Sequence, residues 1–359
     1  MNRIILILLL FTTISFATPS NSKYLESDLK TLKQLHINPS FLEDKLLINT
    51  FNEYSSKSNL SKSIRILKNS SLYSEKIKEE MKTKNIPESI FFIPMLESHF
   101  VNHSNGKNKP AGLWQIMPQT AKTLGLRNDD YIDERLDYIK ATQTATKYLG
   151  TYYKKFGKWH LAILAYNSGE GRVLEAVTRA SFDEYIKQNP SKKNDKKTLA
   201  YKKIIDDYLR TKKNYESLNV VYKELKSMKI DVPLENLIKI DSDVKKNYLS
   251  QHTSLYLRKI VALSMLSNRN FYQKNDFLKS NNSLERVTAP QALQLKSIAA
   301  AINISSKELA NMNKHIKKQV LPKDSKRYVI YIPKNKLEIY NKKIGSINSP
   351  NLKKTGDKN

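Results

Sequence analysis

One glutamate, Glu97, stands near the end of an almost continuously apolar stretch, residues 86–100 (IPESIFFIPMLESHF). On a helix, Ile90, Ile93 and Pro94 would share its face, and Pro94 should bend that helix. Ionising a carboxylate on an apolar face is costly, so we expect the pKa of Glu97 to lie above its usual range, which suits a general acid. The alternative is a core helix whose end reaches solvent, and this stretch alone favours the alternative.

A second stretch, residues 111–126 (AGLWQIMPQTAKTLGL), combines a glycine, an aromatic residue and an amide. Gly112 permits the backbone to approach a ligand closely. Trp114 offers a flat apolar face, and Gln115 offers both a donor and an acceptor. Such a pair can hold a sugar by stacking on its ring and by hydrogen bonds to its hydroxyl or acetamido groups. A core tryptophan beside a surface glutamine is the alternative, and both stay open.

A third stretch, residues 165–173 (AYNSGEGRV), follows a short apolar helix expected over residues 159–166. Tyr166 and Asn167 stand where that helix opens into a glycine-bearing turn, so both polar groups can face a cleft. The alternative is that the pattern signals only a turn.

Helices are expected to position all three stretches. Helical spacing of apolar residues predicts helices over residues 141–156 and 253–268. Residues 18–72 predict a helical N-terminal region that packs against the main helical domain, residues 73–270. Inside that domain, residues 181–250 form a lysine-rich insertion with two predicted helices.

The whole chain, 359 residues, has the composition of a soluble globular protein, with 40 % hydrophobic and 27 % charged residues. Its formal net charge of +28 indicates either an anionic partner or a biased genome composition, and both explanations stay open. The chain has no cysteine, which excludes disulfides, thiolate zinc sites and cysteine nucleophiles. We expect no cofactor and no metal.

The first 17 residues are typical of a secretory signal peptide. Arg3 supplies a positive start, an apolar run follows over residues 4–11, and Ser15 and Ala17 are the small residues of a cleavage site. An uncleaved anchor is the alternative. We therefore expect export to the periplasm or cell envelope, which argues against nucleic acid as the anionic partner.

The C-terminal part has a different pattern. A short strand around Val287, two helices and an alternating strand from Tyr328 predict a small α+β module over residues 284–335. The polar residues 341–359 are expected to be disordered.

Taken together and in this order, the three stretches resemble the lytic transglycosylases with a goose-lysozyme-like fold. The likeness covers residues 73–180 and returns near residues 251–268. It implies a mainly α fold: a lysozyme-like helical catalytic domain, a helical N-terminal extension and a small C-terminal α+β LysM-like module. The LysM resemblance lies in the pattern of elements, so a generic module stays open.

The resemblance also implies roles for particular residues. Glu97 matches the family's sole catalytic acid/base, and Ser98 matches a serine that hydrogen-bonds near it or near the substrate. Tyr256 matches a later tyrosine that the family places near the glutamate. The substrate-binding residues expected from the motifs and the resemblance together are Ser98, Trp114, Gln115, Tyr166, Asn167 and Tyr256.

The implied reaction cleaves the β-1,4 bond between N-acetylmuramic acid and N-acetylglucosamine of peptidoglycan without water. Its product carries a 1,6-anhydro ring, so one acid suffices where hydrolytic glycosidases usually need two carboxylates. The other acids, Glu170 after a turn and Asp129, Asp130, Asp133 and Glu134 in a polar stretch, are expected to be solvated or capping.

Two alternative functions stay open: a hydrolytic muramidase on the same fold and a non-catalytic peptidoglycan-binding protein. The expected partners are the glycan strands of peptidoglycan, with no nucleic acid. Membrane attachment and oligomeric state stay open, as does peripheral association with the wall. The C-terminal module is expected to act separately, so that its removal would weaken wall binding and spare cleavage of soluble fragments.

Overall fold

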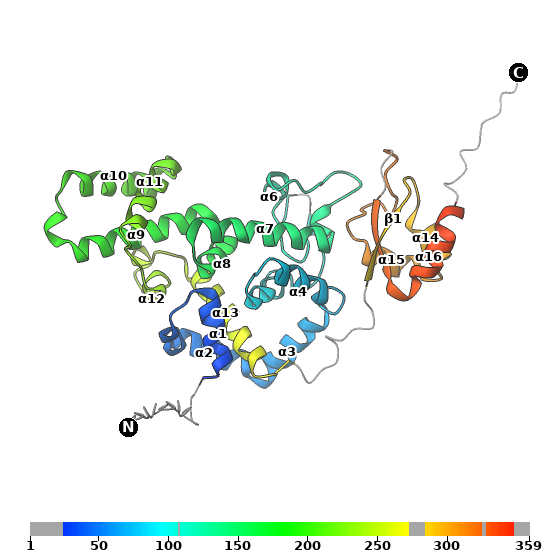
Figure 1. The fold of residues 1–359 in the computed structure, drawn as a ribbon, viewed down its shortest axis with the longest axis horizontal. Helices are drawn as coiled ribbons and strands as arrows, with labels where there is room; N and C mark the ends of the chain where they lie inside the picture. The colour runs from blue at the N-terminus through cyan, green and yellow to red at the C-terminus, as the bar shows by residue number, and fades with distance from the viewer. Residues whose placement is uncertain (1–23, 107, 273–283, 325–327, 348–359) are drawn as a thin grey trace, which may run out of the picture.

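The computed structural model describes residues 24–106, 108–272, 284–324 and 328–347, so the predicted signal peptide lies outside the described residues. The fold is mainly α, as expected, with a small two-stranded sheet in its C-terminal part (Figure 1). The helices before the sheet are α1 Glu26–Leu35, α2 Lys45–Ser55, α3 Lys57–Lys68, α4 Ser74–Thr83, α5 Phe92–Ser98, α6 Pro118–Thr123, α7 Tyr138–Phe156, α8 Trp159–Ser168, α9 Glu170–Gln188, α10 Lys196–Thr211, α11 Tyr215–Ser227, α12 Leu234–Leu237 and α13 Gln251–Asn268.

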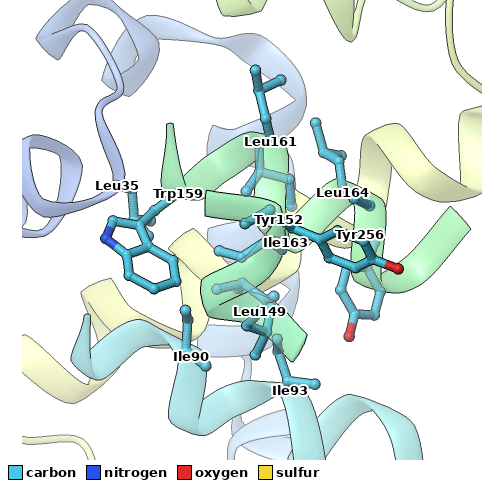
Figure 2. Close-up of a cluster of buried hydrophobic side chains, with 14 of the residues drawn as sticks. Leu35, Ile90, Ile93, Leu149, Tyr152, Trp159, Leu161, Ile163, Leu164 and Tyr256 are labelled. Carbon is cyan, nitrogen blue, oxygen red and sulfur yellow. The ribbon is translucent and has the colours of Figure 1, made fainter. Parts of the chain in front are cut away.

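Helix α8 occupies the centre of the main core. Every residue from Trp159 to Ala165 is buried, because a helix that is apolar on all sides can only be stable when it is surrounded. Helices α7, α9 and α13 pack around it. Figure 2 shows Leu161 and Leu164 of α8 in this cluster, with Ile90 and Ile93 along one side.

Two largely buried ion pairs join the N-terminal helices to α13 and to Arg269, the residue that follows it. Arg258, on α13, donates two hydrogen bonds of 2.8 Å to Asp44, whose carboxylate also caps the start of α2. Arg269 donates to Asp28, on α1. Because a buried charge without its partner is costly, these pairs fix where the N-terminal helices lie against the rest of the chain.

The apolar stretch with Glu97 forms two short helical pieces instead of one helix. A 3-10 turn covers Glu88–Phe91, and α5 follows directly. Pro94 cannot donate to the carbonyl of Ile90 and its ring crowds that carbonyl, which accounts for the break one turn before the proline. Ile90, Ile93 and Pro94 are all buried, so the predicted apolar face is present.

The lysine-rich segment between α9 and α13 contains the two helices expected from its pattern, α10 and α11, and also the short helix α12. Both pack on α9. Phe156, at the end of α7, contacts Tyr222 of α11 edge-to-face at 5.9 Å. In Figure 1 these helices lie at the end of α7 opposite the C-terminal module.

The C-terminal module is built on an antiparallel pair of strands, in which Leu284 faces Pro333 and Ala289 faces Tyr328. Between the strands lie two helices, and the side chain of Ser305 caps the second one by accepting from the backbone N–H of Glu308. The elements of this module are β1 Leu284–Ala289, α14 Leu295–Ala301, α15 Ser306–Met312, β2 Tyr328–Pro333 and α16 Leu337–Lys343.

Helix α16 was not predicted, and it extends into the segment expected to be disordered. Tyr340 holds it in place, because this tyrosine is buried and its hydroxyl donates to the carbonyl of Thr288 at 2.9 Å. A 3-10 turn over Ile344–Ser346 follows. The expected disorder is therefore wrong for residues 341–347, and residues 348–359 lie outside the described residues.

Candidate active site

Glu97 lies in the last turn of α5, half-buried against the core. The hydroxyl of Tyr256, on α13, donates a hydrogen bond of 2.7 Å to its Oε1. Burial raises the pKa of Glu97, and the Tyr256 hydrogen bond and the charge of His252 offset part of that rise. The net direction is upward, as expected, so this carboxyl stays protonated to a higher pH than a solvent-exposed glutamate does.

Two tyrosine hydroxyls lie within the electrostatic influence of this carboxylate. Burial raises the pKa of Tyr256 and of Tyr166 well above the usual value, and the negative charge of Glu97 raises both further. Both tyrosines therefore stay neutral and can act as hydrogen-bond donors.

The three sequence stretches come together through two contacts to backbone carbonyls. The Ser98 hydroxyl lies 2.8 Å from the carbonyl oxygen of Leu113, which joins the first stretch to the second. The Tyr166 hydroxyl donates to the carbonyl of Trp114 at 2.7 Å, which joins the third to the second. Ser98, Tyr166 and Tyr256 thus converge on one region beside Glu97.

Trp114 does not offer a face to a ligand, so the sugar-stacking expectation is wrong in this structure. Its side chain is fully buried, and its indole N–H donates to the hydroxyl of Thr142 at 2.9 Å. Its ring packs edge-to-face on Tyr166 at 6.3 Å. The core supplies a hydrogen-bond acceptor for the indole N–H, so the whole side chain can be buried without leaving that donor unsatisfied.

The side-chain amides of Gln115 and Asn167 differ in their hydrogen bonding within the protein. Gln115 has a left-handed backbone (φ 46°). Its Nε2 donates to the carbonyl of Gly112 at 2.7 Å, so the side-chain amide stabilises the turn in which Gln115 lies. The Oδ1 of Asn167 is buried and, among the described residues, has no hydrogen-bond partner. Such an orphaned acceptor is costly unless a ligand or water satisfies it.

The other acids near these stretches are engaged elsewhere. Glu170 accepts from Lys155 and from the hydroxyl of Tyr215; burial raises its pKa, but these two partners outweigh burial and hold that pKa below its usual range. Asp133 was expected to be solvated and is instead buried, with both carboxylate oxygens bound by Arg135. That expectation was wrong because the arginine two positions on folds back over the carboxylate.

Sequence reasoning missed His252, an exposed histidine one helical turn before Tyr256 on α13. Its charge lowers the pKa of Glu97. The spacing of four residues from Tyr256 places both side chains on one face of α13, and that spacing is the signal that could have found it.

Two cavities lie away from this site. One of about 290 Å³ is lined by residues of α4, the start of α7 and β1, including Tyr138 and Glu285. Another of about 540 Å³ lies beside Trp159 and Lys84. Neither is lined by Glu97, so the candidate site rests on its convergent side chains and not on an enclosed cavity.

Comparison with known families identifies the part of the chain that carries these stretches. Residues 75–189 match the family model described as the transglycosylase SLT domain. The chain carries an SLT domain. A second model, described as the LysM-like domain of lytic transglycosylase MltD, matches residues 283–349. The resemblance to lytic transglycosylases and the mainly α fold with a LysM-like module are thereby confirmed.

Several known proteins are similar to about a quarter of this chain. Membrane-bound lytic murein transglycosylase D of Escherichia coli (strain K12) is 37 % identical over 99 residues, which are 27 % of this chain and 22 % of that protein. A putative tributyltin chloride resistance protein of Alteromonas sp. (strain M-1) is 35 % identical over 100 residues, 28 % of this chain and 48 % of that protein. Peptidoglycan transglycosylase gp16 of Escherichia phage T7 is 42 % identical over 92 residues, 24 % of this chain and 7 % of that protein. The chain therefore spans less than half the length of each of these relatives.

Proposed function

We propose that this protein is a peptidoglycan lytic transglycosylase with Glu97 as its single acid/base. The observation that carries the proposal is the half-buried Glu97, whose Oε1 accepts from Tyr256 and whose pKa is raised. The SLT domain and the murein transglycosylase relatives support the same activity.

The arrangement of the carboxyl group suits proton transfer. Oε1 of Glu97 accepts the hydrogen bond from Tyr256, whereas Oε2 has no hydrogen-bond partner among the described residues. A neutral Glu97 can therefore donate its proton from Oε2 to the leaving oxygen of the β-1,4 bond. The substrate's acetamido group stabilises the positive sugar. Glu97 then accepts the proton of the C6 hydroxyl as that oxygen attacks C1, which regenerates the acid and closes the 1,6-anhydro ring.

Asn167 is the best-supported substrate ligand. Its buried, unpartnered Oδ1 is an acceptor suited to the N–H of an acetamido group. Tyr166 and Ser98 contribute by holding the second stretch, because their hydroxyls lie on the carbonyls of Trp114 and Leu113.

The hydrolytic rival needs a second carboxylate or a positioned water. Glu170 is the acid that the third stretch offers, and it is paired with Lys155 and Tyr215. His252 is the charged residue that shifts the pKa of Glu97. No carboxylate of the described residues shifts it. This environment favours the single-acid reaction.

The direct test compares Glu97→Gln with Glu170→Gln on purified peptidoglycan sacculi. Glu97→Gln keeps the shape of the side chain and removes its transferable proton, so cleavage should fall by at least about 10⁴-fold while the protein still folds and binds sacculi. Glu170→Gln should cleave nearly normally. Loss of cleavage in both variants would favour a two-carboxylate hydrolase, and normal cleavage by Glu97→Gln would favour a non-catalytic binding protein.

Export to the periplasm or cell envelope is the location that fits a wall substrate. The motif over residues 1–17 supports it, and the mature chain would begin at Thr18. None of the helices in the described part of the chain is long and apolar enough to cross a bilayer. Recovery of Met1 by N-terminal sequencing of the exported protein would contradict cleavage.

A further inference from the structure

The LysM-like module contacts the SLT domain along residues 127–137, which we call the docking loop. The backbone N–H of Asp133 donates to the carbonyl of His315 at 2.9 Å, and that of Lys317 donates to Tyr131 at 2.8 Å. These two bonds pair Ile132 with Ile316 as neighbours in an antiparallel bridge. Backbone pairing of this kind fixes the register of one segment against the other.

Each part also contributes a side chain to the other's core. Ile132 of the docking loop is buried within the hydrophobic cluster of the module. Tyr331 of β2 is buried in the main core, where its ring lies 4.6 Å from Tyr138 and its hydroxyl donates to Asp137 at 2.5 Å. Interdigitation of this kind is typical of parts that fold as one body and not of a freely tethered module.

The docking loop in turn supports the loop that carries Trp114. Arg135, fully buried, donates to Asp133 and to the backbone carbonyls of Lys109 and Ile116 at 2.8 and 3.3 Å. The carbonyl of Arg135 lies so close to Gly112 that a Cβ there would meet it at 1.9 Å. Residues 109–116, the site loop, therefore rest directly on the docking loop.

The site loop is the segment that the candidate active site uses. It supplies the two carbonyls on which the hydroxyls of Ser98 and Tyr166 lie. Asp133 links the module to the residue that supports the site loop. Its backbone N–H donates to the carbonyl of His315 in the module, and its carboxylate accepts from Arg135. Hydrogen bonds, together with the short backbone of the site loop, thus connect His315 of the module to Ser98, the residue next to Glu97.

We propose that the LysM-like module is a structural part of the active site: by holding the docking loop it positions the site loop, with Arg135 as the positioning residue. Its contribution to cleavage rests on the proposed function, but its effect on the order of the site loop does not. The expectation that the module acts separately from cleavage is replaced by this proposal.

The test uses the full chain and two matched tyrosine variants. Tyr331→Phe removes the hydroxyl that bonds Asp137 across the interface, whereas Tyr340→Phe removes one that bonds Thr288 inside the module. Hydrogen exchange is measured at the amides of Ala111, Gly112 and Ile116, all of which are hydrogen-bonded in the site loop. A bond to a carboxylate is strong enough that Tyr331→Phe should speed exchange there by at least about tenfold, and Tyr340→Phe should not.

A second variant, Arg135→Lys, breaks the path closer to the site. Lysine keeps the charge and loses the planar fork, so exchange in the site loop should rise while that of Leu321, inside the module, should not. On a soluble glycan fragment, kcat should fall by about tenfold or more and KM should change little, because positioning is lost and not binding.

Two results would overturn the proposal: equal exchange in the site loop for Tyr331→Phe, Tyr340→Phe and the unchanged protein, or a fall in exchange protection for Arg135→Lys without any fall in kcat. If the unchanged protein cleaves no glycan, the proposed function fails, and the exchange measurement still decides whether the module orders the site loop.

Discussion

The hydroxyl of Tyr256 lies 2.7 Å from Oε1 of Glu97, and these residues stand 159 positions apart in the sequence. The contact joins α13 to the short helix α5 at the point where the candidate acid leaves the core. A neutral tyrosine can donate to either protonation state of the carboxyl group. It can therefore hold Glu97 in one orientation through both proton transfers of the proposed reaction.

Replacing Tyr256 with Phe should lower kcat and shift the pH dependence of cleavage. The hydrogen bond favours the ionised carboxylate, so its loss should raise the pKa of Glu97 further. The alkaline limb of the kcat/KM profile should then move to higher pH, while kcat falls by about tenfold because Glu97 loses its orientation. A pH–rate profile on a soluble glycan fragment measures both effects. An alkaline limb that moves to lower pH would contradict this role.

The unchanged protein should lose activity as the pH rises through the raised pKa of Glu97. The reaction begins from the protonated acid, so kcat/KM should fall on the alkaline side and should level off on the acidic side. In Glu97→Gln this limb should be absent from any residual activity. A limb that persists unchanged in Glu97→Gln would assign the titration to another group.

The same shift predicts how stability depends on pH. The folded-state pKa of Glu97 is above its unfolded value, so its contribution to stability is full below the unfolded pKa and is lost as the pH rises through the folded one. Glu97→Gln should therefore be more stable than the unchanged protein at neutral pH and should lose that advantage in acid. Urea unfolding at neutral pH and at about pH 4 measures the difference. An advantage that grows in acid would contradict the shift.

Breaking the Asp44–Arg258 pair should detach the N-terminal helices from α13. Asp44→Ala leaves Arg258 buried without its partner, which should cost about 3 kcal/mol of unfolding free energy. Burial raises the pKa of Asp44, but Arg258 and the backbone of Leu47 outweigh it, so the folded-state pKa is lowered. The stabilisation is thus present above the unfolded pKa and disappears as the pH falls through the folded one.

Denaturant unfolding of Asp44→Ala at neutral pH and at about pH 2 tests this, since the difference from the unchanged protein should shrink in acid. Ser40→Ala is the control, because its hydroxyl bonds Glu235 at the surface near the same helix. A loss for Ser40→Ala equal to that of Asp44→Ala would mean that the ion pair adds nothing particular.

The burial of Trp114 predicts that its replacement affects stability before it affects substrate binding. Trp114→Phe leaves the Thr142 hydroxyl without the indole donor and opens space in the core, which should cost about 2 kcal/mol. The KM for a soluble fragment should stay within about twofold, because no stacking surface is removed. A large rise in KM without loss of thermal stability would restore the sugar-stacking role.

Local pattern was sufficient for several helices and both strands, but not for α16 or for the contacts that build the site. The helices of the lysine-rich segment and the cap at Ser305 could be predicted, because spacing and capping depend on neighbours in the sequence. Trp114 could not be assigned, because an aromatic beside an amide reads the same in a core and in a sugar site. The Tyr256 contact came only from the family resemblance, since nothing local links residues so far apart.

The docking loop shows the same limit. Its acidic residues were interpreted as part of a polar, solvated stretch, but the module and Arg135 bury Asp133. The alternating pattern of β2 predicted a strand with a buried face, and it could not show that Tyr331 would be buried against another domain. Each surface of such an interface has an ordinary sequence pattern, so the interface cannot be recognised from either segment by itself.

The central claim, a single acid that cleaves without water, is tested most directly by the mass of the products released from purified peptidoglycan sacculi. The account predicts fragments lighter by one water than hydrolysed ones, with 1,6-anhydro ends, from the unchanged protein and from Glu170→Gln, and none from Glu97→Gln. Fragments with reducing ends, or undiminished release by Glu97→Gln, would contradict it.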